Sequence, residues 1–108
     1  MKCRTLSTWG GGKQFCYEGS VSTGTTIRYG KELRWTATIS ASDYQRILQY
    51  FSKSDVAVGT SKDTPPPGSV GEWVKANVNK SGLMSYIGAI LVQEGYAAKP
   101  GVGRIRFF

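Results

Sequence analysis

The spacing of apolar residues changes once along this chain, close to residue 41, and this change constrains the fold more than any other feature. From residue 32 to residue 40, apolar and polar residues alternate, which is the period of a β-strand with one buried face. From residue 44 to residue 51, apolar residues recur at i, i+3, i+4 and i+7, which is the stripe of an amphipathic helix. The chain is therefore expected to begin as β-structure and to continue as helices.

Residues 1–40 are predicted to form an antiparallel β-meander. Its strand-like segments are residues 2–9, 14–18, 26–29 and 32–40. Turns are expected at the glycine run 10–12 and at Gly30 with Lys31.

The second half is predicted to hold three helices and a β-hairpin. Ser42, Ser69 and Ser81 can each cap the start of a helix, and Gly95 can end the third in a left-handed conformation. Two strands, 96–99 and 104–108, then form the hairpin. Loop 59–68 contains three prolines and is expected to be an extended connector, with a ligand for a proline-recognising domain as the alternative.

A chain of 108 residues is expected to be a single domain, 1–108, with a β-region at 1–40 and a helical region at 41–108. The predicted fold class is α+β: an N-terminal antiparallel β-meander packed on a three-helix half with a C-terminal β-hairpin. No apolar stretch approaches the roughly 20 residues of a membrane span. No signal-peptide segment follows Met1, so a cytoplasmic protein without a membrane partner is expected.

Two cysteines, Cys3 and Cys16, lie on either side of the glycine turn. If Trp9 faces Gln14 across that turn, Cys16 lies opposite Ser7, and the two sulfurs are several residues out of register. Free thiols are therefore expected, although a shifted turn would allow a disulfide. With two cysteines and no histidine, the chain is not expected to hold zinc, which needs about four such ligands.

The chain carries a net charge of +7, concentrated in two segments. Residues 1–40 and residues 75–108 each carry +4, and residues 41–74 carry −1. A polyanionic partner is one interpretation, and a cationic, solvated surface is the other.

Catalysis is not expected. The chain has no histidine for acid–base chemistry near neutral pH, and its seven carboxylates form no close pair. Cys16 has no evident base partner, and the glycine run before Lys13 lacks the spacing of a phosphate-binding loop. No catalytic residue, metal site or cofactor is therefore predicted.

From residue 42 onward the expected order is helix, helix, tight turn at 79–81, helix and β-hairpin. The third helix ends in Leu91-x-x-x-Gly95-Tyr96 immediately before the hairpin. In this order residues 42–108 resemble the winged helix-turn-helix fold, so the second half is expected to be winged-helix-like. The resemblance is one of architecture; it points to no particular family and does not extend to the β-region.

The resemblance implies DNA binding by a small regulatory protein. The third helix would lie in the major groove with its first residues near base edges, and the hairpin would act as a wing on phosphates. Gly82 and Met84 belong to those first residues. The predicted nucleic-acid-binding residues are Lys75, Lys80, Ser81, Ser85, Lys99, Arg104 and Arg106.

The composition of the third helix favours another interpretation. From Leu83 to Glu94 it is apolar nearly all round and contains no Lys or Arg, whereas base recognition needs such donors. The helix is therefore also a candidate core element beneath the N-terminal sheet. The alternative function is a protein–protein interaction module, or an accessory or inhibitor protein.

Aromatic and basic residues are interleaved in the β-region, as in sheets that bind single strands by stacking. However, Tyr29 and Trp35 share the phase of the apolar residues Ile27 and Leu33. They are therefore expected in the core, with the basic residues of the same strands on the opposite face.

Overall fold

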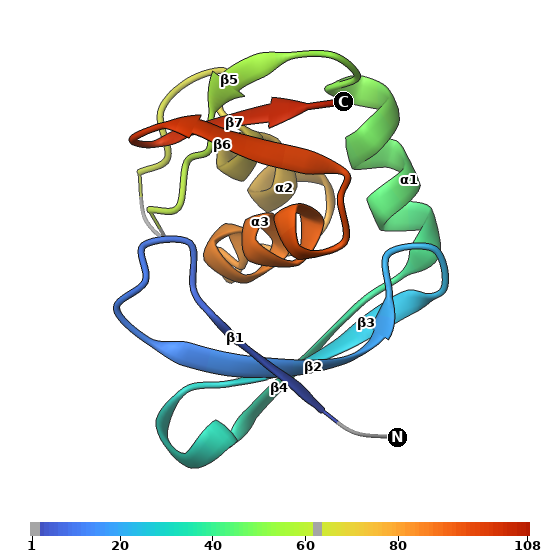
Figure 1. Ribbon diagram of the computed structural model, residues 1–108, viewed down its shortest axis with the longest axis vertical. Coiled ribbons are helices and arrows are strands. Elements are labelled where there is room, and N and C mark those ends of the chain that lie inside the picture. Colours follow the sequence, from blue (N-terminus) through green and yellow to red (C-terminus); the bar gives the residue numbers. More distant parts are fainter. Residues whose placement is uncertain (1–2, 62–63) are drawn as a thin grey trace.

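The computed structural model describes residues 3–61 and 64–108, and it places helices between two antiparallel sheets (Figure 1). The first sheet confirms the predicted meander, because its strands pair in chain order. These strands are β1 (Arg4–Ser7), β2 (Gln14–Ser20), β3 (Gly24–Tyr29) and β4 (Trp35–Ile39), with a 3₁₀ turn η1 (Lys31–Leu33) between the last two.

The second half contains the expected three helices and C-terminal hairpin, which confirms the α+β class. A short strand joins the hairpin and gives the order β5-β7-β6. The elements are α1 (Ala41–Tyr50), β5 (Asp55–Ala57), α2 (Val70–Asn77), α3 (Met84–Gln93), β6 (Ala97–Gly101) and β7 (Arg104–Phe107).

Helix α3 lies in the centre of the molecule, between the first sheet and the β6–β7 hairpin (Figure 1). Its side chains Ile87, Ile90 and Leu91 are fully buried, in the same core cluster as Phe15 and Tyr17 of β2. An element covered on both sides gains from apolar residues all round. The interpretation of α3 as a core element is therefore confirmed.

The β1–β2 loop is part of the cover over α3. The Trp9 N–H donates a hydrogen bond to the Ser85 carbonyl at 2.9 Å. The Trp9 ring lies against Gly88, where an added Cβ would be 2.8 Å from the ring. Glycine at this position therefore allows the loop to pack directly on the helix.

The opposite end of α3 is attached to the first sheet. The Glu94 carboxylate accepts hydrogen bonds from the Tyr17 hydroxyl at 2.8 Å and from the Val21 N–H at 2.9 Å, and it pairs with Arg4 at 3.6 Å. Together with the Trp9–Ser85 hydrogen bond at the start of the helix, these contacts hold both ends of α3 against the first sheet and its β1–β2 loop.

Two of the predicted helix boundaries agree with the structure, and two differ from it. Ser69 accepts from the Glu72 N–H at 3.1 Å, and Gly95 has φ +84 after α3, as expected. The cap of α1 is Ser40, which accepts from the Asp43 N–H at 3.0 Å, so the predicted cap at Ser42 was wrong. The residue before α3 is Leu83, which makes no side-chain cap, so the predicted cap at Ser81 was also wrong.

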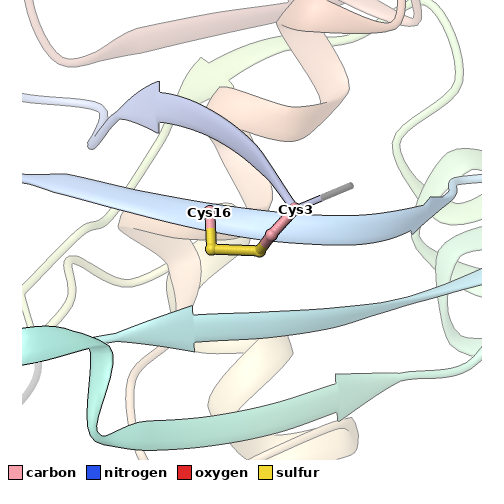
Figure 2. Close-up of a disulfide and its surroundings, with 2 residues drawn as sticks. All are labelled: Cys3 and Cys16. Atoms are coloured by element: carbon pink, nitrogen blue, oxygen red, sulfur yellow. A yellow bond between two sulfur atoms is a disulfide. The ribbon is translucent and has the colours of Figure 1, made fainter. Parts of the chain in front are cut away.

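The prediction of free thiols was wrong, because Cys3 and Cys16 form a disulfide (Figure 2). The β1–β2 connection is longer than expected, and Ser7 rather than Trp9 lies opposite Gln14. This register brings the cysteine Cα atoms to 5.3 Å, within the range that a disulfide spans.

The predicted strand 32–40 begins later than expected, at Trp35. Glu32 and Leu33 have positive φ values of 58° and 54°, which a strand does not allow. The expectation that Leu33 and Trp35 are core residues was therefore wrong, since their side chains are 41% and 59% exposed.

Two predictions extend beyond the described residues. The first predicted strand began at residue 2, and the Pro-rich loop includes residues 62–63; these positions lie outside them. Among the described residues, no helix has the length and apolar character needed to cross a membrane.

Candidate binding groove

The predicted wing arginines lie on the outer face of β7. Arg104 and Arg106 are exposed, while Ile105 between them is buried, as the alternation predicts. Both arginines pair with Asp55 of β5, at 3.0 Å and 3.6 Å, and Arg104 also donates to the Asp55 carbonyl. Their charge is therefore partly balanced by a neighbouring strand.

Lys99 is directed toward the β1–β2 loop. Its Nζ donates to the Trp9 carbonyl at 2.7 Å and lies 4.6 Å from the centre of the Trp9 ring. An ammonium over an indole face is a favourable cation–π contact. In this position Lys99 holds the loop against the body of the protein.

The first residues of α3 offer little surface to a duplex. Gly82 and Met84 are buried, and Ser85 is half-buried with its carbonyl bonded to the β1–β2 loop. Ser81 is exposed. The structure therefore brings together few of the base-reading residues that the winged-helix resemblance implied.

The remaining predicted residues lie before α3. Lys80 is exposed in the turn that leads to Ser81, and Lys75 is half-buried on α2.

A groove of about 670 Å³ lies at the end of the meander where β2 begins and β3 turns into β4. We call it the aromatic groove. Its charged residues are Lys13 and Lys31, and its size is within the range of small-ligand pockets, about 300–1,000 Å³. The lining residues are Lys13, Gln14, Tyr29, Gly30, Lys31, Trp35, Ser81, Leu83 and Tyr86.

The aromatic side chains of Tyr29, Trp35 and Tyr86 line this groove. Tyr29 and Tyr86 contact each other with ring centres 4.8 Å apart, and Phe15 supports Tyr86 from the core at 5.1 Å. Burial raises the pKa of Tyr86, with a smaller contribution from Tyr29. Trp35 is the exposed member of the set, so one part of the aromatic surface is open to a ligand.

Backbone geometry at the β3–β4 turn positions Trp35. Tyr29 and Trp35 are direct partners across the two strands. Gly30 between them has φ +80, and an added Cβ there would collide with the Trp35 ring. The indole therefore lies directly against the glycine backbone.

The predicted separation of aromatic and basic residues was wrong at this end of the sheet. It holds for Arg28, which is exposed on β3 beside the buried Ile27. The groove lysines, however, lie in turns and not in strands. The alternation of side chains along a strand therefore does not determine on which side of the sheet they lie. Gly30 followed by Lys31 is the sequence signal that could have indicated this, because a glycine turn at a strand end leaves room for an aromatic ring.

Two smaller concavities are less suited to an anion. One, of about 350 Å³ beside α1, has no Lys or Arg in its lining. The other, of about 310 Å³, contains Lys99, which is already bonded to Trp9.

No family model, curated protein or solved structure matches this chain.

Proposed function

We propose that this protein binds nucleic acid, without catalysing a reaction on it, through the aromatic groove. The observation that carries the proposal is that an exposed indole and two lysines share one concavity. Lysines attract the phosphate backbone, and aromatic rings stack on bases. The net charge of +7 attracts a polyanion to the whole surface.

The turn before α3 belongs to this proposed surface. Ser81 lines the groove, and the exposed Lys80 precedes it in the chain. Both therefore remain proposed contacts. Arg104 and Arg106 remain proposed phosphate contacts outside the groove, while Lys75, Ser85 and Lys99 have weaker support because each is half-buried or bonded within the protein.

A winged-helix-like arrangement of residues 42–108 also remains a proposal. The order α1, α2, α3 and hairpin supports it. The buried position of α3 argues against the usual use of such a fold, in which that helix enters the major groove.

The test is a fluorescence-anisotropy titration with a labelled mixed-sequence DNA about 20 nucleotides long, at two salt concentrations. We expect binding that weakens with salt, because lysine–phosphate contacts release counterions. Lys13→Glu/Lys31→Glu should weaken binding about tenfold or more. No binding to single-stranded or duplex DNA at low salt would refute the proposal.

The matched control is Arg28→Glu/Lys53→Glu. Both of its sites are exposed and neither lines the aromatic groove. Each double variant reverses two positive charges and takes the net charge from +7 to +3. An equal loss of affinity in the two variants would mean that general charge, and not the groove, holds the DNA.

A protein-interaction module is the second candidate. Tyr50 is 66% exposed at the end of α1 and packs on Trp73 of α2 with ring centres 5.4 Å apart. Exposed aromatic residues are common anchors of protein interfaces. Concentration-dependent association in analytical ultracentrifugation, abolished by Tyr50→Ser, would support this use.

The cytoplasmic location stays a prediction. The Cys3–Cys16 disulfide weighs against it, because disulfides persist mainly in oxidising compartments. Alkylating free thiols in intact cells before lysis would show whether both cysteines are oxidised where the protein resides.

A further inference from the structure

We infer that the ligand of the aromatic groove is a single-stranded segment of nucleic acid, with one unpaired base stacked on Trp35. The inference rests on the proposed function and specifies its substrate class. It follows from three properties of the groove: an open aromatic face, the fixed position of that face, and the placement of positive charge.

The open face belongs to Trp35, whose side chain is 59% exposed although it lines a concavity. In a duplex, the faces of the bases are covered by their neighbours in the stack. An indole can therefore stack on a base only where the strand is unpaired or a base is turned out. An exposed indole next to lysines thus favours a single strand over a duplex.

The position of Trp35 is set before any ligand binds. Its strand pairs with β3 at Tyr29, and its ring rests on Gly30. A side chain that is already held in place loses little conformational entropy on binding, so more of the stacking energy contributes to affinity. Tyr29 in turn packs on Tyr86 of α3, which ties the site to the core.

Positive charge reaches the groove from two different turns. Lys13 lies at the end of the β1–β2 loop, and Lys31 begins η1 between β3 and β4. Two separate lysines suit successive phosphates of a strand better than one phosphate of a free nucleotide. Glu32, next to Lys31, is exposed and is not among the residues that line the groove.

The size of the groove agrees with this ligand. A concavity of about 670 Å³ is of the size that holds a small molecule, which suits a short stretch of one strand better than a whole duplex. We therefore expect a short binding site, at the lower end of the roughly 4–16 nucleotides that single-strand-binding folds occupy.

The experiment compares a labelled 12-nucleotide strand with the duplex made from it, using the full chain with its disulfide intact. An RNA strand of the same sequence serves as a second single-stranded probe. We expect the single strands to bind about tenfold tighter than the duplex. Trp35→Ala should lower the single-strand affinity about tenfold, because the stack is lost.

Two further variants make the result specific. Trp35→Phe keeps an aromatic face, so it should retain most of the affinity but lose the fluorescence quenching that a base stacked on the indole causes. Phe108→Ala removes an exposed aromatic residue elsewhere, at 67% exposure against 59% for Trp35, and should bind like the wild type. Circular dichroism of each variant checks that the protein remains folded.

The possible failures are distinguishable. If strand and duplex bind equally and Trp35→Ala changes neither, the single-strand inference is overturned while nucleic-acid binding stands. If a mononucleotide such as AMP displaces the strand at equal nucleotide concentration, the ligand is a free nucleotide and the inference is again overturned. If neither strand nor duplex binds, this inference and the proposed function both fail.

Discussion

The Trp35 ring packs directly on the backbone of Gly30, in a space that no side chain at residue 30 could share with it. This contact makes a turn residue part of the candidate site, although it has no functional group of its own. Other glycines of the chain have a similar φ but open surroundings. Comparing substitutions at these glycines with a substitution at Gly30 therefore separates the effect of backbone strain from the effect of the indole position.

The first prediction concerns Gly30→Ala, which should displace the indole and weaken single-strand binding about fivefold or more. Gly68→Ala is the matched control, since Gly68 also has φ +80 and nothing lies within 4 Å of its added Cβ. Both variants should lose about 1–2 kcal/mol of stability in urea unfolding, because alanine is strained at positive φ. Equal affinity of the two variants would contradict a role for the indole position.

The second prediction concerns the attachment of α3 to the first sheet. Glu94→Gln should lower the free energy of unfolding by about 1–3 kcal/mol, because the carboxylate accepts hydrogen bonds from both Tyr17 and Val21. An amide replaces one acceptor with a donor. Glu18→Gln, at a half-buried site of β2, is the control and should change stability little in the same urea titration. A loss as large in the control would show that the Glu94 contacts are not special.

The third prediction concerns alkaline pH. Burial, and then the hydrogen bond to Glu94, raise the pKa of Tyr17 from 10.0 to about 12. The folded state thus favours the neutral phenol more than the unfolded chain does. This stabilisation is complete below pH 10 and is lost as the pH rises toward 12.

The comparison of wild type with Tyr17→Phe isolates this effect. Both proteins retain Tyr44, whose pKa is raised chiefly by burial and least by Tyr17, so most of its contribution cancels in the comparison. The free energy of unfolding should fall more steeply for the wild type than for the variant as the pH rises above 10, the ordinary pKa of tyrosine. Parallel curves in urea titrations would refute the prediction.

The fourth prediction concerns the disulfide. It joins residues 13 apart, and closing a loop of about 15 residues is worth roughly 3 kcal/mol. Reduction should therefore lower the free energy of unfolding by about 2–3 kcal/mol. Cys3→Ser/Cys16→Ser, measured with and without reductant, should be insensitive to it. Two reactive thiols in the untreated native protein would contradict the bridge.

Much of the fold could be predicted from local patterns. The strand period before residue 41 and the helix period after it locate the meander and the first two helices, because each of these elements shows one face to the core. The apolar surface of α3 likewise indicated burial. Its covering by Trp9 was not foreseen, because that contact depends on a loop conformation that no periodicity encodes.

Strand and helix periods alone do not predict the candidate groove or the disulfide, for two related reasons. Three consecutive glycines allow several hairpin registers, and the register that the chain adopts brings Cys16 within reach of Cys3. At the next turn, Leu33 continues the strand period in sequence but has positive φ in the structure, which interrupts the strand and leaves Trp35 exposed. In both places the turn, and not the strand pattern, decides which side chains meet.

The most direct test of the account is the affinity of one 12-nucleotide strand for wild type, Lys13→Glu/Lys31→Glu and Arg28→Glu/Lys53→Glu, measured by anisotropy at low salt. We predict that the groove variant binds about tenfold more weakly than the control variant, although both carry the same net charge. Equal affinities for the two variants, or no binding by the wild type, would contradict the aromatic groove as the nucleic-acid site.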